Sequence, residues 1–343
     1  IQLYSRKKGV MHTSALRPDG ELLEKWLKLL PYTLTKAQQR VISEIKQDVV
    51  KSSPMNRLVQ GDVGCGKTDV AMAAILMAVQ SGKQAALMAP TEILAEQHNR
   101  KLSELFSKLG VKVTCRTGNL SKKVQTEVDK MIASGEAQVV IGTHALIQGK
   151  LVFNKLGLVV VDEQHRFGVH QRQVLAEKGR SPHTLVMTAT PIPRTLALSF
   201  YGELDKSIID ELPPLRMPIN TRSVQENGRQ AMYEFTRAEL KAGRQAYVVY
   251  PLIEESEKSD LKAAVIGEKY LAENIFPEFK VVMIHGRMKP DEKDKVMNSF
   301  RAGQIQVLVS TTVIEVGVDV PAASIMIIEH ADRFGLAQLH QLG

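Results

Sequence analysis

Short runs of apolar and β-branched residues recur along this chain, and each is followed by a polar turn and a stretch with helical spacing. Strands that alternate with helices predict parallel α/β layers, since a crossover helix returns the chain to the same edge of a parallel sheet. The run 158–161 is apolar throughout, as is typical of a strand buried on both faces. We expect strands at 57–60, 84–89, 112–116, 138–142, 158–161, 185–188, 245–250, 280–284, 306–310 and 324–328, and helices that include 67–80 and 92–109.

The alternation pauses where three prolines fall within residues 212–218 and then resumes, which predicts a linker at 213–218. We therefore predict two α/β lobes, 31–212 and 219–343. An amphipathic stretch at 21–30 ends at Pro31, so residues 1–30 are expected to form a lead-in with one helix.

Composition narrows the class of protein only slightly. The chain has 343 residues, enough for two domains, and 45 Lys and Arg against 37 Asp and Glu, which weakly favours a polyanionic partner. Aromatic residues make up 5%, which disfavours base-stacking platforms. Two cysteines are too few for a disulfide framework or a thiolate metal site and suit a reducing cytosol, and no apolar run reaches membrane-spanning length.

A phosphate loop is the most specific motif. Residues 61–68 read GDVGCGKT, which matches the pattern G-x-x-x-x-G-K-[ST] between a strand-like run and a helix-like run. Glycines let backbone N–H groups surround phosphate oxygens, Lys67 would reach the β- and γ-phosphates of ATP, and the Thr68 hydroxyl would hold Mg²⁺. The candidate nucleotide-binding residues here are Gly61, Asp62, Val63, Gly64, Cys65, Gly66, Lys67 and Thr68.

Two carboxylates complete the predicted ATP site. The apolar run 158–161 ends in Asp162 and Glu163, the Walker-B arrangement. We predict that Asp162 holds Mg²⁺ and that Glu163 orients or deprotonates the attacking water. Thr190, in the sequence Thr188-Ala189-Thr190 after another strand, is predicted to relay between the γ-phosphate and the nucleic acid.

The order of these motifs resembles helicase superfamily 2. The strings GDVGCGKT, DEQHRFGVHQR, TATPIPRTLAL, HGRMKPDEKDKVM and STTVIEVGVDVPAAS are similar to the RecG family of bacterial branched-DNA helicases, from about residue 20 onward. The resemblance implies two RecA-like P-loop NTPase lobes, each a mostly parallel sheet flanked by helices. It also implies a 3′–5′ ATP-dependent DNA helicase that uses Mg²⁺ and remodels branched DNA in repair and recombination. A monomer in the bacterial cytosol is implied, with a single-stranded DNA-binding protein as a further partner.

The same resemblance implies roles for single residues. Gln38 stands where such motors read adenine, and Gly317 and Asp319 stand where the second lobe senses nucleotide. Gln338 and Gln341 open motif VI. The residues expected to contact the nucleic-acid backbone are Pro90, Thr91, Thr117, Gly118, Thr143, His144, Thr311 and Thr312.

Three departures from the family qualify this picture. Cys65 stands where Ser is commoner, with little expected effect because that position supplies mainly its backbone N–H. The sequence ends within motif VI, so the family's arginine finger is expected beyond residue 343. The family's branch-binding wedge domain is also expected outside the printed sequence.

Two alternatives stay open at this point. One is another superfamily 2 motor, either an RNA helicase or a transcription-repair coupling translocase, and the other is a binding module that holds nucleotide without turnover. The intact Lys67, Thr68, Asp162 and Glu163 argue against the module. An ATPase assay with branched DNA, linear DNA and RNA would separate the three.

Overall fold

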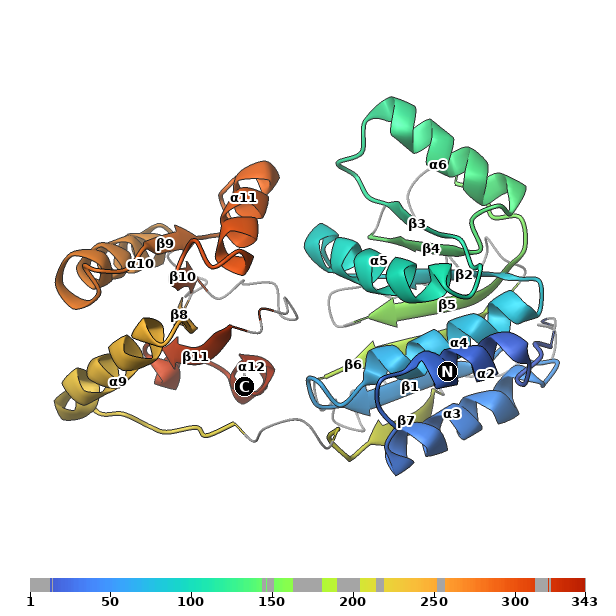
Figure 1. Cartoon of the computed structure of the whole chain (residues 1–343), viewed down its shortest axis with the longest axis horizontal. Coiled ribbons are helices and arrows are strands. Elements are labelled where there is room, and N and C mark those ends of the chain that lie inside the picture. The colour runs from blue at the N-terminus through green and yellow to red at the C-terminus, as the bar shows by residue number, and fades with distance from the viewer. Residues whose placement is uncertain are drawn as a thin grey trace, which may run out of the picture. The chain divides into compact units, whose positions relative to one another are not determined.

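The chain folds into two compact units, residues 1–217 and 218–343 (Figure 1). The computed structural model describes residues 13, 15–143, 146, 151–162, 181–189, 204–213, 219–251, 257–311, 320 and 322–342. No helix among these residues is both long enough and apolar enough to span a bilayer.

The first unit is built on a seven-stranded sheet in the order β3-β4-β2-β5-β6-β1-β7, and every strand pair is parallel. All six strands predicted for this half are present. The seventh, β7, was not predicted, because it is a short edge strand with exposed Asp205 and Lys206 in place of a continuous apolar run. The strands are β1 (Asn56–Gly61), β2 (Gln84–Met88), β3 (Val113–Arg116), β4 (Val139–Gly142), β5 (Leu156–Asp162), β6 (His183–Thr188) and β7 (Asp205–Ile209).

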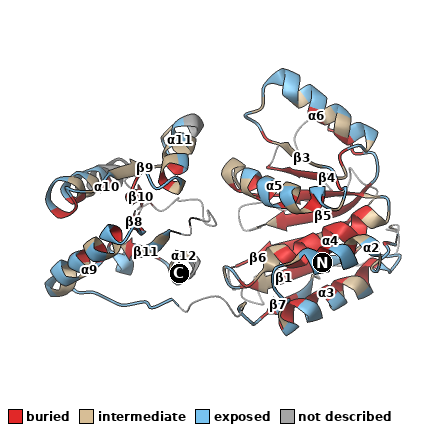
Figure 2. Ribbon diagram, viewed as in Figure 1, coloured by how far each residue is buried: buried red, intermediate tan, exposed pale blue. Residues whose placement is uncertain are grey.

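Helix α4 (Lys67–Gln80) lies at the centre of the first unit. It is apolar around its whole circumference and buried from Asp69 to Val79, which Figure 2 shows as a nearly continuous red helix. The buried faces of α2 and α3 belong to the same hydrophobic core, with Trp26 of α2 fully enclosed. The other helices of this unit are α2 (Glu21–Leu29), α3 (Lys36–Val49), α5 (Glu92–Ser107) and α6 (Lys122–Ser134).

The second unit repeats the architecture on a smaller scale. Its four-stranded parallel sheet has the order β11-β8-β10-β9, with the four predicted strands at β8 (Gln245–Tyr250), β9 (Val281–Ile284), β10 (Val307–Thr311) and β11 (Ala323–Ile328). Helices α9 (Arg229–Lys241), α10 (Glu257–Tyr270), α11 (Pro290–Arg301) and α12 (Leu336–Leu342) accompany the sheet. The α/β fold class predicted from the sequence is therefore confirmed, with two RecA-like lobes.

Arg57 ties the first strand of the first unit to α3 and to the edge strand β7. Its buried guanidinium donates to Asp48 (2.7 Å from Nε), Glu44 (3.0 Å) and Ser207 (2.8 Å). Burial opposes ionisation of Asp48, but hydrogen bonds from Lys51 and Arg57 outweigh it, and the pKa of Asp48 lies below its ordinary value. Because β1 leads into the phosphate loop, this network fixes the strand that carries the loop.

We expect Arg57→Ala to lower the free energy of unfolding of the first unit by about 3 kcal/mol, because the buried carboxylate of Asp48 loses its buried cation and keeps the contact with the exposed Lys51. Lys112→Ala is the matched control. This change breaks the ion pair between Lys112 and Glu136, in which both side chains are half exposed. It should lower the free energy of unfolding by less than about 1 kcal/mol. Urea unfolding measures both, and equal losses would contradict the structural role of Arg57.

The Arg57 network also predicts a dependence on pH. Because the folded-state pKa of Asp48 is depressed, its contribution to stability is present above the unfolded-state pKa of about 4 and is lost as the pH falls through the folded value. Asp48→Asn should therefore flatten the acid limb of the stability curve measured by urea unfolding. An unchanged limb would show that Asp48 contributes nothing to it.

Candidate nucleotide and nucleic-acid site

The phosphate loop joins β1 to α4 and depends on glycine conformations. Gly64 and Gly66 have φ of 78° and 86°, in the left-handed region that favours glycine. A Cβ atom at Gly66 would also collide with the side-chain amide of Gln38. Gly66 is the N-cap of α4, and no side chain caps that helix end. The first N–H groups of α4, together with the positive end of its dipole, therefore provide an anion-binding site.

Lys67 and Thr68 lie in the first turn of α4, where both are partly exposed. The Lys67 ammonium donates to the carbonyl oxygens of Gly61 (2.7 Å) and Asp62 (2.9 Å). These bonds hold the ammonium over the loop, within reach of any phosphate that the loop binds. An ammonium group has three donors, so it can exchange carbonyl partners for phosphate oxygens.

Gln38 contacts the phosphate loop directly. Its side chain is buried, its Oε1 accepts the Thr35 N–H (2.7 Å), and its Nε2 donates to the Cys65 carbonyl (3.0 Å). The first bond completes a capping box at the start of α3. The second bond joins α3 to the backbone of the phosphate loop at Cys65. The structure thus places Gln38 as a support of the loop, and its contact with adenine stays a prediction.

Asp162 lies on the same edge of the sheet as the phosphate loop. It is the last residue of β5 and is in register with Met187 of β6, which is in register with Val59 of β1. Two strand spacings separate β5 from β1, a distance of about 10 Å. Parallel strands end at a common edge, so Asp162 and the loop after Gly61 lie at the same edge of the sheet.

The donor set fits ATP carried with Mg²⁺. The Thr68 hydroxyl and the Asp162 carboxylate are hard oxygen donors, and Mg²⁺ in such sites keeps water and phosphate oxygens as its other ligands. Within the described part of the chain, no group of three or more His, Cys, Asp or Glu side chains could hold a metal by itself. These residues therefore suit a metal that arrives with the nucleotide.

The residues predicted to contact nucleic acid lie at the carboxyl ends of neighbouring strands. In the first unit, Pro90 and Thr91 follow β2, and Thr117 and Gly118 follow β3. Thr143 follows β4, whose last residue is in register with the ends of both β2 and β3. Gly118 is exposed and donates its N–H to Glu92 Oε1 (2.8 Å), which ties two of these strand ends together.

Three threonines in this predicted set are more enclosed than the sequence suggested. Thr117, Thr143 and, in the second unit, Thr311 are all buried, so their hydroxyls present little surface. Thr91 is partly exposed and caps α5 by accepting the Leu94 N–H (3.3 Å). At this edge, Thr91 is the better-presented candidate for a phosphate contact, because its hydroxyl can still donate, whereas the N–H of the exposed Gly118 already donates to Glu92.

Several predicted residues lie outside the described part of the chain, namely Glu163, Thr190, His144, Thr312, Gly317 and Asp319. Gln338 is exposed on α12 and accepts the Gly335 N–H (3.0 Å), whereas the side chain of Gln341 is not described.

Two contacts at the site were not predicted. His98 Nε2 lies 2.8 Å from Asp162 Oδ2. The Tyr32 hydroxyl donates a hydrogen bond to Asp69 (3.0 Å), which lies in the first turn of α4. Asp69 is buried, and burial raises the pKa of its carboxyl group. Neither pair belongs to a recognisable motif, and both join positions far apart in the sequence.

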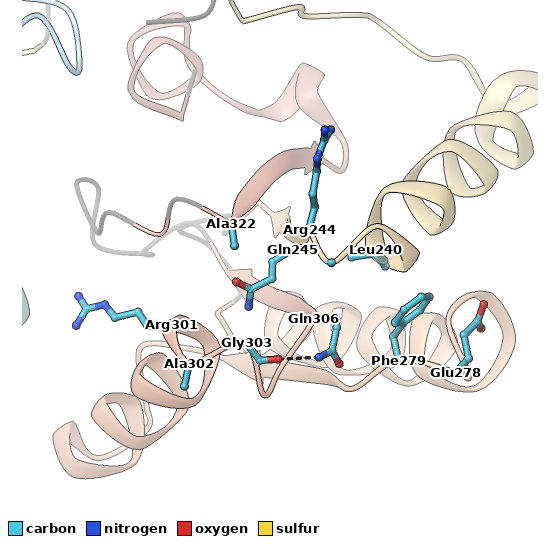
Figure 3. A pocket seen from close by; sticks show the side chains of 11 residues that line it. Leu240, Arg244, Gln245, Glu278, Phe279, Arg301, Ala302, Gly303, Gln306 and Ala322 are labelled. Atoms are coloured by element: carbon cyan, nitrogen blue, oxygen red, sulfur yellow. Dashed lines mark hydrogen bonds between the residues drawn. The ribbon is translucent and has the colours of Figure 1, made fainter. Parts of the chain in front are cut away.

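The second unit contains a cavity of about 550 Å³, lined by residues such as Arg244, Gln245 and Gln306 (Figure 3). These residues lie at the starts of the strands, whereas ligands of open α/β sheets bind at the carboxyl ends. Gln245 opens β8 and donates to the carbonyls of Phe300 and Ile305, as Gln84 does to Ile132 and Ala137 at the start of β2. We therefore interpret the cavity as part of the scaffold.

Comparison with known proteins places the chain in a family. Residues 35–198 match the DEAD/DEAH box helicase family, and residues 229–342 match the helicase conserved C-terminal domain. With the phosphate loop and the two parallel sheets, these matches define a two-lobed helicase motor of superfamily 2. The chain is 55% identical over its whole length to the ATP-dependent DNA helicase RecG of Synechocystis and 52% identical over 94% of its length to that of Thermotoga maritima. Over nearly its whole length the chain is thus similar to part of these RecG proteins.

A solved structure of RecG bound to a three-way DNA junction superimposes on 99% of the chain, with a TM-score of 0.83 and 45% identity. The chain spans 41% and 42% of the Synechocystis and Thermotoga proteins and 45% of that structure. The matched region is thus less than half of each relative.

Proposed function

We propose that this chain is the ATP-driven motor of a RecG-type DNA helicase, which translocates on DNA and remodels branched substrates during repair and recombination. One observation carries the proposal. A single edge of the first sheet presents the phosphate loop and Asp162 on one side and the strand ends around Thr91 and Gly118 on the other. ATP and a phosphodiester backbone can therefore bind to one rigid sheet.

The chain's own residues divide the work of hydrolysis. The loop N–H groups and Lys67 bind the phosphates, and Lys67 offsets charge that builds on the γ-phosphoryl oxygens. Thr68 and Asp162 would hold Mg²⁺, which would neutralise part of the negative charge of the phosphates. Glu163 would orient the attacking water and accept its proton. Gln38 keeps the loop in place through the Cys65 carbonyl.

DNA is proposed to bind through its backbone, with little reading of base sequence. N–H groups and hydroxyls at strand and helix ends suit phosphates and carry no sequence information. Action as a monomer in the bacterial cytosol, and partnership with a single-stranded DNA-binding protein, are proposed from the similarity to RecG proteins alone.

An ATPase assay with a forked DNA, a linear duplex and an RNA hairpin of equal length tests the proposal. We expect stimulation in the order forked DNA, linear duplex, RNA. Stronger stimulation by RNA would favour an RNA helicase, and nucleotide binding without turnover on any substrate would favour a binding module.

Binding to DNA should be steeply sensitive to salt and nearly indifferent to sequence, because the net charge is +8 and the contacts are proposed to be with phosphates. If six or more phosphates are neutralised, affinity should fall by about 10³-fold or more between 50 and 200 mM salt. Fluorescence anisotropy with two duplexes of unrelated sequence measures both properties. A flat salt response, or a strong preference for one sequence, would contradict backbone binding.

A further inference from the structure

The contact between His98 and Asp162 is a feature of the site that the proposed mechanism does not use. The two side chains are mostly buried, with 11% and 15% of their surfaces exposed, and His98 Nε2 lies 2.8 Å from Asp162 Oδ2. An ionised carboxylate can only accept hydrogen bonds, so the proton lies on Nε2 and the ring donates. One carboxylate oxygen is thereby held in place, and the other has no hydrogen bond to any residue that the structure describes.

His98 is carried by a helix that also begins at the predicted DNA edge. Thr91 caps α5, and Glu92 in its first turn accepts the Gly118 N–H. His98 lies seven residues beyond Thr91, or about 10 Å along the helix axis. The core side of α5 is fixed by buried residues that include Leu94, Leu102 and Phe106. Movement at its first turn is therefore transmitted to His98 through a packed, rigid element.

We infer that His98 is a positioning residue, which orients the Asp162 carboxylate for Mg²⁺ and connects it to the DNA-facing end of α5. The inference rests on the proposed function, in which Asp162 holds the metal. Residues that hydrogen-bond a metal ligand restrict its orientation, and their loss typically weakens metal binding by about 10- to 100-fold. His98 meets that description through a single hydrogen bond whose geometry is fixed by α5 and β5.

Three variants of the full chain separate positioning from simple packing. His98→Leu fills a similar volume without a donor. His98→Gln can place an amide N–H at the same number of bonds from Cα as Nε2. Ile132→Ala is the structural control, because Ile132 is fully buried in the hydrophobic core of the same unit but lies on α6, outside the helix that carries His98. Thermal unfolding confirms that each variant is folded before it is used.

The primary measurement is the affinity for Mn²⁺, followed by electron paramagnetic resonance, with a non-hydrolysable ATP analogue bound. We expect His98→Leu to weaken Mn²⁺ binding by about 10-fold or more, with unchanged affinity for the analogue in the absence of metal. His98→Gln should restore most of the affinity, and Ile132→Ala should lower the unfolding temperature while Mn²⁺ binding stays as in the wild type.

A second measurement tests the connection to DNA. The Mg²⁺ concentration that gives half-maximal DNA-stimulated turnover should rise in His98→Leu, while the affinity for DNA itself stays unchanged. Wild-type Mn²⁺ affinity in His98→Leu, or equal weakening in His98→Leu and Ile132→Ala, would overturn the inference and leave the proposed function standing. If the wild-type chain binds the analogue but no Mn²⁺ with it, both proposals fail.

Discussion

Lys67→Ala is expected to abolish ATP turnover, with kcat lowered by about 10²–10³-fold or more, as when one preorganised donor to a developing oxyanion is removed. Lys67 is the first residue of α4, and its ammonium already lies over the loop carbonyls of Gly61 and Asp62. The variant loses a charge-assisted donor to the phosphates and leaves the loop's glycines and the buried body of α4 unchanged.

The control for this change is Lys122→Ala. Lys122 is likewise the first residue of its helix, α6, and it is exposed. Intrinsic ATP turnover, measured by phosphate release without DNA, should be lost in Lys67→Ala and kept in Lys122→Ala. Wild-type turnover in Lys67→Ala would refute the assignment of residues 61–68 as the ATP site.

Glu163→Gln is expected to bind ATP with Mg²⁺ and to hydrolyse it about 10²–10⁴-fold more slowly, because glutamine keeps the shape of glutamate and cannot accept the proton of water. The neighbouring Asp162, held by His98, would still be available to the metal. The variant should therefore accumulate in its ATP-bound state. Equilibrium binding of a fluorescent ATP analogue and single-turnover hydrolysis measure the two properties separately.

Asp162→Asn provides the complementary comparison. It should weaken the Mg²⁺-dependent part of nucleotide binding, because an amide oxygen is a poorer ligand for Mg²⁺ than a carboxylate. If nucleotide binding vanished in Glu163→Gln and survived in Asp162→Asn, the roles proposed for the two carboxylates would have to be exchanged.

The fold could be predicted from the sequence wherever apolar residues are contiguous. The run 158–161 identifies β5 because a strand covered on both faces has no polar position. The edge strand β7 has only two buried residues, Ser207 and Ile209, and its short alternation carries no such signal. The phosphate loop was predictable for a related reason: its function requires glycines, a lysine and a hydroxyl at fixed spacing within eight consecutive residues.

Contacts between distant segments were not predictable in this way. His98 and Asp162 are 64 positions apart, and Arg57 and Ser207 are 150 apart. Their pairing depends on strand order and on the way each helix packs over the sheet, and neither leaves a local pattern. The contacts of Gln38 were likewise not predictable from its local sequence. Its motif predicted a contact with adenine, whereas in the folded chain its side chain accepts the Thr35 N–H and donates to the Cys65 carbonyl.

The enclosure of α4 has a mechanical consequence. A helix surrounded by core from Asp69 to Val79 has no free face on which to slide, and interiors packed to crystal-like density resist compression. If the loop before α4 binds the γ-phosphate as proposed, the phosphate would lie against a helix that cannot shift within its core. Cleavage of ATP would then leave α4 in place, and any conformational change would have to occur in parts of the chain that move relative to it.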